Sequence, residues 1–193
     1  MRLFIGVELS DRLRHAAARA SDRLRDRVHQ VAPESRVRWI PGDNLHVTVW
    51  FLGEVTDTTA ETVRRAMSAP LAVPAFTLRL EGAGAFPPSG EPRALWLGLT
   101  SGQNSLLAIH DRLGSRLGTL GFEPEKRAFS PHLTIGRVKE AQRSTASAIR
   151  RVLRENSEIV GDCEIGTVTL FRSRTMPTGS QYEVVLRTPL TTN

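Results

Sequence analysis

One four-residue pattern occurs twice and constrains the fold more than any other feature: histidine, apolar residue, threonine, apolar residue. The first copy is His46-Val47-Thr48-Val49 and the second is His132-Leu133-Thr134-Ile135. Both lie in runs of β-branched and apolar residues that predict strands. Because residues i and i+2 of a strand share a face, each copy places an imidazole beside a hydroxyl, with two apolar side chains behind them. The fold must therefore bury one face of both strands and leave the other accessible.

The segments around the two motifs follow the same order of predicted elements, strand, helix, strand, helix, strand, on either side of the Pro/Gly-rich stretch 86–92. This order predicts one α+β domain over residues 1–193. We expect a pseudo-duplicated fold of two facing lobes, with approximate halves 1–86 and 93–193. Whether strands are exchanged between the lobes stays open at this point.

The boundaries of the predicted elements follow from hydrophobic periodicity and from Gly and Pro residues. Strands are predicted at 2–9, 37–40, 45–52, 75–83, 93–100, 132–138, 163–171 and 181–187. Helices are predicted at 11–31, 57–69, 103–120 and 140–155. A turn around Pro177-Thr178-Gly179 joins the last two strands in a hairpin.

Composition excludes several classes of protein. Hydrophobic residues make up 40% of the chain and charged residues 24%, a balance typical of soluble globular proteins and not of disordered ones. No apolar run approaches the ~18 residues that span a bilayer, and Glu8 interrupts the first one, so neither a membrane helix nor a signal peptide is expected. The single cysteine, Cys163, excludes an internal disulfide. These features predict a cytoplasmic protein.

The positive charge of the chain is carried almost entirely by arginine. The formal net charge is +6, and the only lysines are Lys126 and Lys139. The planar guanidinium donates two parallel hydrogen bonds and so matches phosphate oxygens. The charge therefore favours RNA or a nucleotide as partner. Solvated arginine faces without a partner would give the same composition.

Two histidines and two threonines on facing strands suit acid–base chemistry at phosphorus. A neutral imidazole accepts a proton while a charged one donates, and threonine hydroxyls donate hydrogen bonds to phosphate oxygens. No nucleophile elbow, P-loop or dinucleotide fingerprint occurs in its required context. Neither motif contains a carboxylate, so no metal and no cofactor are expected. The remaining histidines, His15, His29 and His110, are expected on helix surfaces.

The paired motifs resemble the 2H phosphoesterase superfamily and, within it, the bacterial and archaeal RNA 2′,3′-cyclic phosphodiesterases, also called 2′-5′ RNA ligase-like proteins. The resemblance covers essentially the whole chain. Besides the two motifs it rests on Arg2-Leu3-Phe4-Ile5, Asn44-Leu45, Phe51-Leu52-Gly53-Glu54, Arg93-Ala94-Leu95-Trp96-Leu97-Gly98, Pro131 and Arg137, and on Ser173, Gly179 and Tyr182 in the final hairpin. Thr175 departs from the leucine that is more usual in the family, which is a packing change.

The resemblance implies a bilobal α+β fold in which two antiparallel sheets line a central cleft, with helices outside. It implies a hydrolase that opens the terminal 2′,3′-cyclic phosphate of RNA to a 2′-phosphomonoester without a metal, with reverse 2′-5′ RNA ligation as a further activity. His46 matches the proton donor and His132 the proton acceptor. Thr48 and Thr134 match the residues that hold the phosphate. We expect a monomer acting on RNA ends, tRNA fragments among them.

Three further residues are candidates for the site, and two other functions stay open. Arg137 is a phosphate-binding candidate if a bulge or strand end near Gly136 turns it to the face of His132. Phe4 and Trp50 are candidates for stacking on a base. The alternative functions are a phosphodiesterase for a small cyclic nucleotide or a 2′-5′ oligonucleotide, and a nucleotide-binding module without catalysis.

Overall fold

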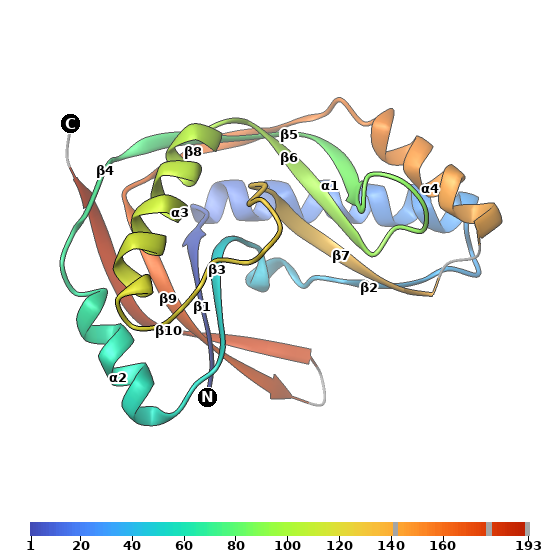
Figure 1. Ribbon diagram of the computed structural model, residues 1–193. Helices are drawn as coiled ribbons and strands as arrows, with labels where there is room; N and C mark the ends of the chain where they lie inside the picture. Colours follow the sequence, from blue (N-terminus) through green and yellow to red (C-terminus); the bar gives the residue numbers. More distant parts are fainter. Residues whose placement is uncertain (141–142, 177–178, 192–193) are drawn as a thin grey trace.

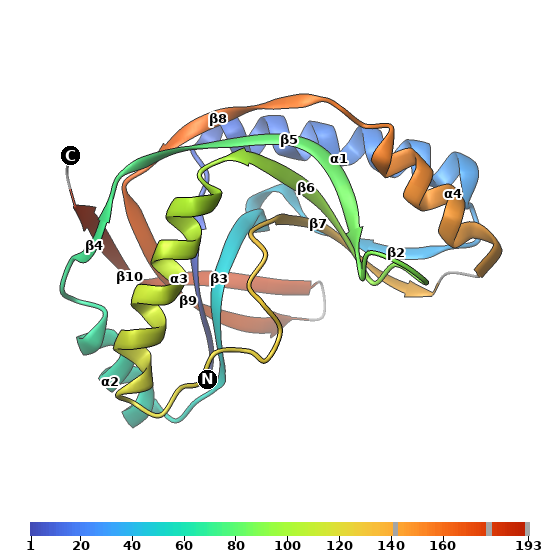
Figure 2. The same ribbon diagram turned by 45° about the horizontal axis from the view of Figure 1, so that its top comes forward.

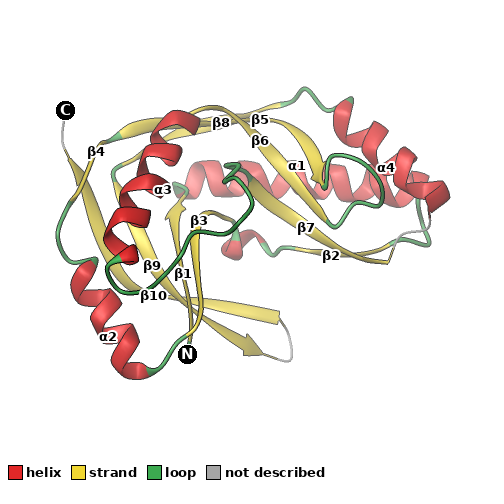
Figure 3. Ribbon diagram, in the orientation of Figure 1, coloured by secondary structure: helices red, strands yellow, loops and turns green. Residues whose placement is uncertain are grey.

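The computed structural model describes residues 1–140, 143–176 and 179–191 and confirms the predicted α+β class (Figures 1 and 3). The helices are α1 (Asp11–Val31), the 3-10 turn η1 (Gly42–Asn44), α2 (Asp57–Ala66), α3 (Gln103–Gly118) and α4 (Arg143–Arg154). The strands are β1 (Arg2–Glu8), β2 (Arg36–Trp39), β3 (His46–Glu54), β4 (Leu71–Pro74), β5 (Phe76–Phe86), β6 (Ala94–Ser101), β7 (Leu133–Glu140), β8 (Ile159–Ile165), β9 (Thr167–Met176) and β10 (Gly179–Thr191).

The strands of the described residues form two groups that meet at one point. Their order is β4-β10-β9-β1-β3-β7-β6-β5-β8, with β2 paired to β7. The register pair Val47 to Leu133 between β3 and β7 is the junction of the two groups. Figure 2 shows β5 to β8 arching over one side and the β9–β10 hairpin running along the other. The predicted sheets are thus continuous through the middle strands, and the pairing is antiparallel except between β4 and β10.

The helices lie outside the sheet, as Figure 3 shows. α1 begins at Ser10, whose side chain accepts a hydrogen bond from the Leu13 N–H and so caps the first turn. One face of α1 is buried against β8 and α4, while α3 packs on β3 and β4. The buried face of α1 consists of Leu13, Ala17, Ala20, Ser21, Leu24 and Val28. This helical spacing explains why the predicted range 11–31 agrees with the structure.

Each group of strands contains segments from both ends of the chain. β9 pairs with β1 and β10 pairs with β9, whereas β2 pairs with β7 of the other group. The strand predicted at 163–171 is wrong, because the chain bends at Gly166 into β8, which pairs with β5, and β9, which pairs with β1. The short strand β4 was not predicted. The centre of the predicted hairpin turn, Pro177-Thr178, lies outside the described residues, as do positions 141–142 of the helix predicted at 140–155.

Candidate active site

The two His-x-Thr motifs meet at the junction of the two groups of strands. Val47 of the first motif is the antiparallel register partner of Leu133 of the second. Continuing this register by one residue in each direction sets His46 opposite Thr134, and Thr48 opposite His132. Since opposed residues share a face of the sheet, the two imidazoles and two hydroxyls come together on one face. The buried Val47 and Leu133 anchor this arrangement from behind.

His46 is held by a main-chain carbonyl on one side and by a hydroxyl on the other. Its Nδ1 donates to the Asn44 carbonyl oxygen at 2.7 Å, and its Nε2 lies 3.0 Å from Thr48 Oγ1. Because a carbonyl oxygen only accepts, Nδ1 carries the proton of the neutral ring and Nε2 accepts from Thr48. Asn44 is itself fixed, since its side-chain amide donates to the Ser180 carbonyl in β10 at 2.6 Å.

Aromatic rings surround the imidazole of His46. The Phe4 ring stacks on it with centroids 4.8 Å apart, the Tyr182 ring meets it edge-on at 5.0 Å, and Phe171 lies at 5.7 Å. The neighbouring strand comes close at Gly6, where an added Cβ would lie 2.6 Å from the Val47 carbonyl oxygen. A side chain at position 6 would therefore displace the strand that carries His46.

His132 repeats the main-chain contact but has a more open setting. It lies one residue before β7, and its Nδ1 donates to the Ser130 carbonyl at 2.7 Å, again two residues upstream. The Phe86 ring meets the imidazole edge-on at 4.9 Å. Within residues 1–140, 143–176 and 179–191, Nε2 of His132 has no hydrogen-bond partner. That lone pair is free to accept a proton.

Burial favours the neutral form of both imidazoles. The pKa of His46 is lowered to about 4, mainly by burial and also by the positive charge of Arg137, while the hydrogen bond to Asn44 opposes the change. Burial also lowers the pKa of His132, and the charges of Arg137 and Arg127 add to this effect. Arg137 is therefore near enough to both histidines to influence their titration.

A cavity of about 460 Å³ opens beside the motifs. Thr48, His132, Thr134 and Arg137 line it, whereas His46 is not among the lining residues and contacts one of them, Thr48. The other lining residues include the aromatic side chains of Trp50, Phe51, Phe86, His110 and Phe129 and the charged side chains of Arg93, Glu125 and Arg127. This volume falls within the range of small-molecule sites, and its polar part suits a phosphate group.

Arg137 reaches the cavity because β7 is irregular. Leu95 of β6 is opposite Gly136, but the next residue of β6, Trp96, is opposite Thr134. β7 therefore has one extra residue between these pairs, as in a β-bulge, which shifts the alternation of its side chains. Arg137 consequently joins His132 and Thr134 at the cavity instead of facing away from them.

The two aromatic residues proposed for base stacking lie in different places. Phe4 is 4% exposed, is not part of the cavity wall and packs against His46, so it supports the histidine and offers no open face to a base. Trp50 is also 4% exposed but lines the cavity, and its stacking role stays a prediction. Phe51, which the sequence did not single out, lines the cavity and is 50% exposed.

His110 and two loop residues were missed as parts of the cavity. His110 was expected on the surface, but its ring stacks on Phe129 with centroids 4.7 Å apart and meets Trp50 at 4.8 Å. Arg127 lies over the Phe86 ring, 4.9 Å from its centroid. Only the tertiary fold brings the loop before β7 to α3 and β3, so no local pattern could have indicated these contacts.

The described residues contain no group of three His, Cys, Asp or Glu side chains placed to hold a metal ion. In the same part of the chain, no helix combines the length and apolar character needed to cross a membrane.

Comparison with known proteins shows which family the chain belongs to. A family model for the 2′-5′ RNA ligase superfamily matches residues 13–175. The chain belongs to the 2′-5′ RNA ligase superfamily. The resemblance inferred from the two motifs is thereby confirmed.

Two of the similar proteins carry the same name. The RNA 2′,3′-cyclic phosphodiesterase of Aeropyrum pernix is 33% identical over 165 residues, covering 84% of this chain and 90% of that protein. The protein of the same name from Archaeoglobus fulgidus is 31% identical over 183 residues, covering 95% and 97%. Among solved structures, Escherichia coli LigT in its apo form is 26% identical with a TM-score of 0.74, covering 98% of this chain and 97% of that chain. A second structure of that protein, complexed with phosphate, has a TM-score of 0.70 at 25% identity and the same coverage.

Proposed function

We propose that the protein hydrolyses the 2′,3′-cyclic phosphate at the end of an RNA to a 2′-phosphomonoester, without a metal, with His46 as proton donor and His132 as proton acceptor. The activity of the class is supported by relatives named RNA 2′,3′-cyclic phosphodiesterase that align over most of the chain. The observation that carries the mechanism is the pair of imidazoles at the β3–β7 junction, each with Nδ1 tied to a main-chain carbonyl two residues upstream.

Because Nδ1 of each ring donates a hydrogen bond to a main-chain carbonyl, Nε2 is the nitrogen that transfers protons in the proposed reaction. In the proposed step a water oxygen attacks phosphorus, the bond from phosphorus to O3′ breaks, and His132 Nε2 takes the proton from the water. His46 Nε2 gives a proton to O3′, so the product carries a 2′-phosphate and a 3′-hydroxyl. The two histidines then hold exchanged protonation states, which proton exchange with solvent resets.

The donor role requires His46 to be charged when the substrate is bound. In the free protein burial lowers its pKa to about 4, so the ring is neutral near pH 7. A phosphodiester bound at Thr48, Thr134 and Arg137 brings a negative charge beside the ring. An adjacent opposite charge favours the charged form, so binding should raise the pKa of His46. The hydroxyl of Thr48 is then released from Nε2 to donate to the phosphate.

The same step with a 5′-hydroxyl in place of water would join RNA ends by a 2′-5′ bond, because that hydroxyl attacks phosphorus as the bond to O3′ breaks. His132 would take the proton of that hydroxyl as it takes the proton of water, and His46 would again protonate O3′. We expect the protein to act as a monomer in the cytoplasm on RNA ends, including tRNA fragments.

The test is incubation with a short RNA that ends in a 2′,3′-cyclic phosphate, in buffer containing EDTA. The expected result is complete opening of the cyclic phosphate, with the phosphate on the 2′ oxygen. Product with the phosphate on the 3′ oxygen, or loss of activity in EDTA restored by a divalent metal, would contradict the proposal. Binding of the RNA without turnover would favour the non-catalytic module, and turnover of cyclic mononucleotides alone would favour the small-nucleotide enzyme.

A further inference from the structure

Two arginines are opposed on neighbouring strands, and one of them, Arg137, lines the cavity. Arg38 of β2 is the register partner of Arg137 of β7. The next pair in this ladder is Val37 with Val138, and after a shift in register it is followed by Arg36 with Glu140, whose side chains form an ion pair at 3.4 Å. Opposite charges on directly opposed residues stabilise a sheet, and like charges destabilise it. The opposed side chains therefore carry opposite charges at the Arg36 end of this strand pair and like charges at the Arg137 end.

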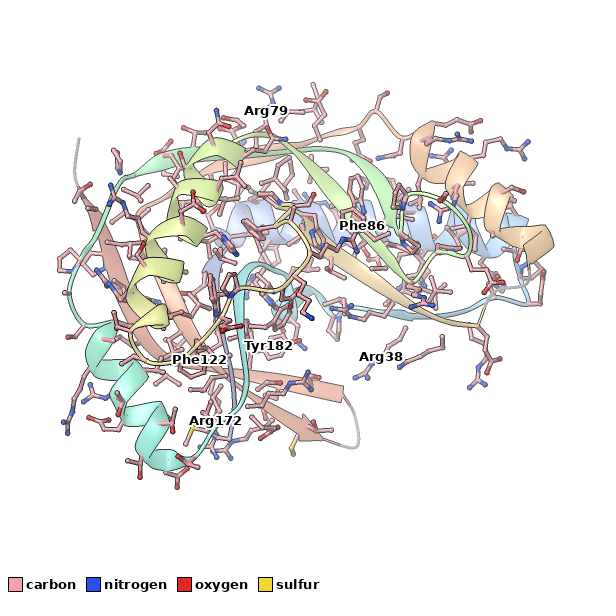
Figure 4. All side chains as sticks on the ribbon, viewed as in Figure 1. Arg38, Arg79, Phe86, Phe122, Arg172 and Tyr182 are labelled. Atoms are coloured by element: carbon pink, nitrogen blue, oxygen red, sulfur yellow. The ribbon has the colours of Figure 1, made fainter. Side chains whose placement is uncertain are left out.

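Arg38 is exposed and has no ion pair or hydrogen bond within the described part of the chain. Its guanidinium lies next to the β9–β10 hairpin, because a Cβ added at Gly179 would come within 3.1 Å of Nη2. Figure 4 shows Arg38 pointing into the space between β2 and that hairpin. Because opposed residues share a face of the sheet, Arg38 lies on the same face as Arg137, but it is not among the residues that line the cavity.

A second phosphate of the substrate would relieve the repulsion between the two arginines. Arg137 lines the cavity beside His132 and is the candidate contact of the reacting phosphate. Directly opposed residues in an antiparallel pair lie only ~5 Å apart at Cα, so Arg38 is placed to reach the next charge along a bound strand. Guanidinium groups bind phosphates through charge-assisted hydrogen bonds.

We propose that Arg38 binds the internucleotide phosphate adjacent to the cyclic end, so that the preferred substrate is an RNA of at least two nucleotides and not a cyclic mononucleotide. This inference rests on the proposed function of the same site. Arg38 contacts the substrate away from the reacting atoms, so its loss should raise KM and leave kcat nearly unchanged.

The experiment compares three substrates: a cyclic mononucleotide, a dinucleotide with a terminal cyclic phosphate, and that dinucleotide with an uncharged methylphosphonate linkage. Arg38→Gln should raise KM for the charged dinucleotide roughly five- to twentyfold, as expected for one charged hydrogen bond, and leave the other two substrates within about twofold. It should also reduce the salt dependence for the charged dinucleotide by about one counterion. Arg36→Gln is the matched control on the same strand and face, and it should not discriminate among the substrates.

The outcomes separate this inference from the proposed function. Equal effects of Arg38→Gln on all three substrates, or equal KM values of wild type for the charged and uncharged linkages, would overturn the inference while the phosphodiesterase stands. If wild type turns over none of them, the proposed function fails. The phosphate site is then tested by the binding of a dinucleotide 3′-phosphate with either a charged or a methylphosphonate linkage. Arg38→Gln must weaken the binding of the charged dinucleotide and leave the binding of the methylphosphonate unchanged.

Discussion

The two His-x-Thr motifs have nearly the same backbone setting but different side-chain environments. In both, Nδ1 donates to the carbonyl two residues upstream at 2.7 Å. His46 is enclosed by Phe4, Phe171 and Tyr182, and its Nε2 contacts Thr48. His132 lines the cavity next to Arg137 and Arg127. The repeated strand motif therefore gives the two imidazoles the same main-chain contact. The residues around them are not repeated, so the two rings differ in enclosure and in access to the cavity.

That inequality bears on the assignment of roles. An enclosed ring that exchanges its hydroxyl partner for a phosphate changes charge only when substrate is bound, which suits a donor. A ring that lines the cavity with a free Nε2 is able to take a proton from water in the resting state, which suits an acceptor. The arrangement needs no third ionisable group.

The largest expected effect comes from removing either imidazole. His46→Ala and His132→Ala should each lower kcat/KM by a factor on the order of 10²–10⁴, the range for a lost general acid or base. Steady-state kinetics on an RNA with a cyclic phosphate end measures both. The double variant should lose much less than the product of the two factors, because the residues act in one step. A single variant with wild-type activity would mean that its motif is structural.

The next effect is the pH dependence of the free energy of unfolding, which should differ between variants of the two histidines. The folded pKa of His46, about 4, lies below its unfolded value of 6.5, so the unfolded chain binds more protons between these values. This contribution to the free energy of unfolding, about 3 kcal/mol, is complete above pH 6.5 and is lost as the pH falls to 4. Urea titrations at pH 7 and pH 4 should show a smaller difference for His46→Gln than for wild type.

His132→Gln is the control for that measurement. Its pKa is lowered in the same direction, but the ring lies at the cavity wall, so the substitution should remove less of the pH dependence. An equal change in both variants would contradict the difference in burial between the motifs.

Substitution of a threonine should lower the activity less than substitution of a histidine, and the two threonine variants should differ in their pH dependence. Thr48→Val and Thr134→Val each remove one donor to a charged phosphate and should cost about tenfold to a hundredfold in kcat/KM. Thr48 also donates to His46 Nε2 and thereby stabilises the neutral ring. Thr48→Val should therefore raise the pKa of His46 and shift that limb of the pH–rate profile upward, whereas Thr134→Val should not. The serine variants, which keep the hydroxyl, serve as controls, and an unshifted profile for Thr48→Val would rule out the contact.

The parts of the fold that follow local rules were predictable from the sequence. Ser10, the helical spacing from Leu13 to Val28 and the break before Pro33 define α1. The alternation in the two motifs defines the start of β3 and β7. The bend at Gly166 was not predictable, because residues 163–171 have continuous strand character and only pairing with β5 and β1 separates β8 from β9.

The site likewise has parts that were predictable from the sequence and parts that were not. The face shared by His46 and Thr48 follows from strand geometry. The main-chain acceptors at Asn44 and Ser130 have no side-chain signature, and His110 joins the cavity only because α3 packs on β3. The position of Arg137 depends on a bulge in β7. The glycine at position 136 permits a bulge, but the sequence alone does not show that one forms.

The unequal roles of the two histidines are tested most directly by a substrate whose leaving group needs no proton. In an RNA cyclic phosphate with sulfur at the 3′ bridging position, the leaving thiolate is stable because thiols have a pKa of about 8.5. His46→Ala should turn over this substrate within about tenfold of wild type, while His132→Ala should remain 10²–10⁴-fold slower. Rescue of His132→Ala instead of His46→Ala would contradict the assignment and exchange the donor and acceptor roles.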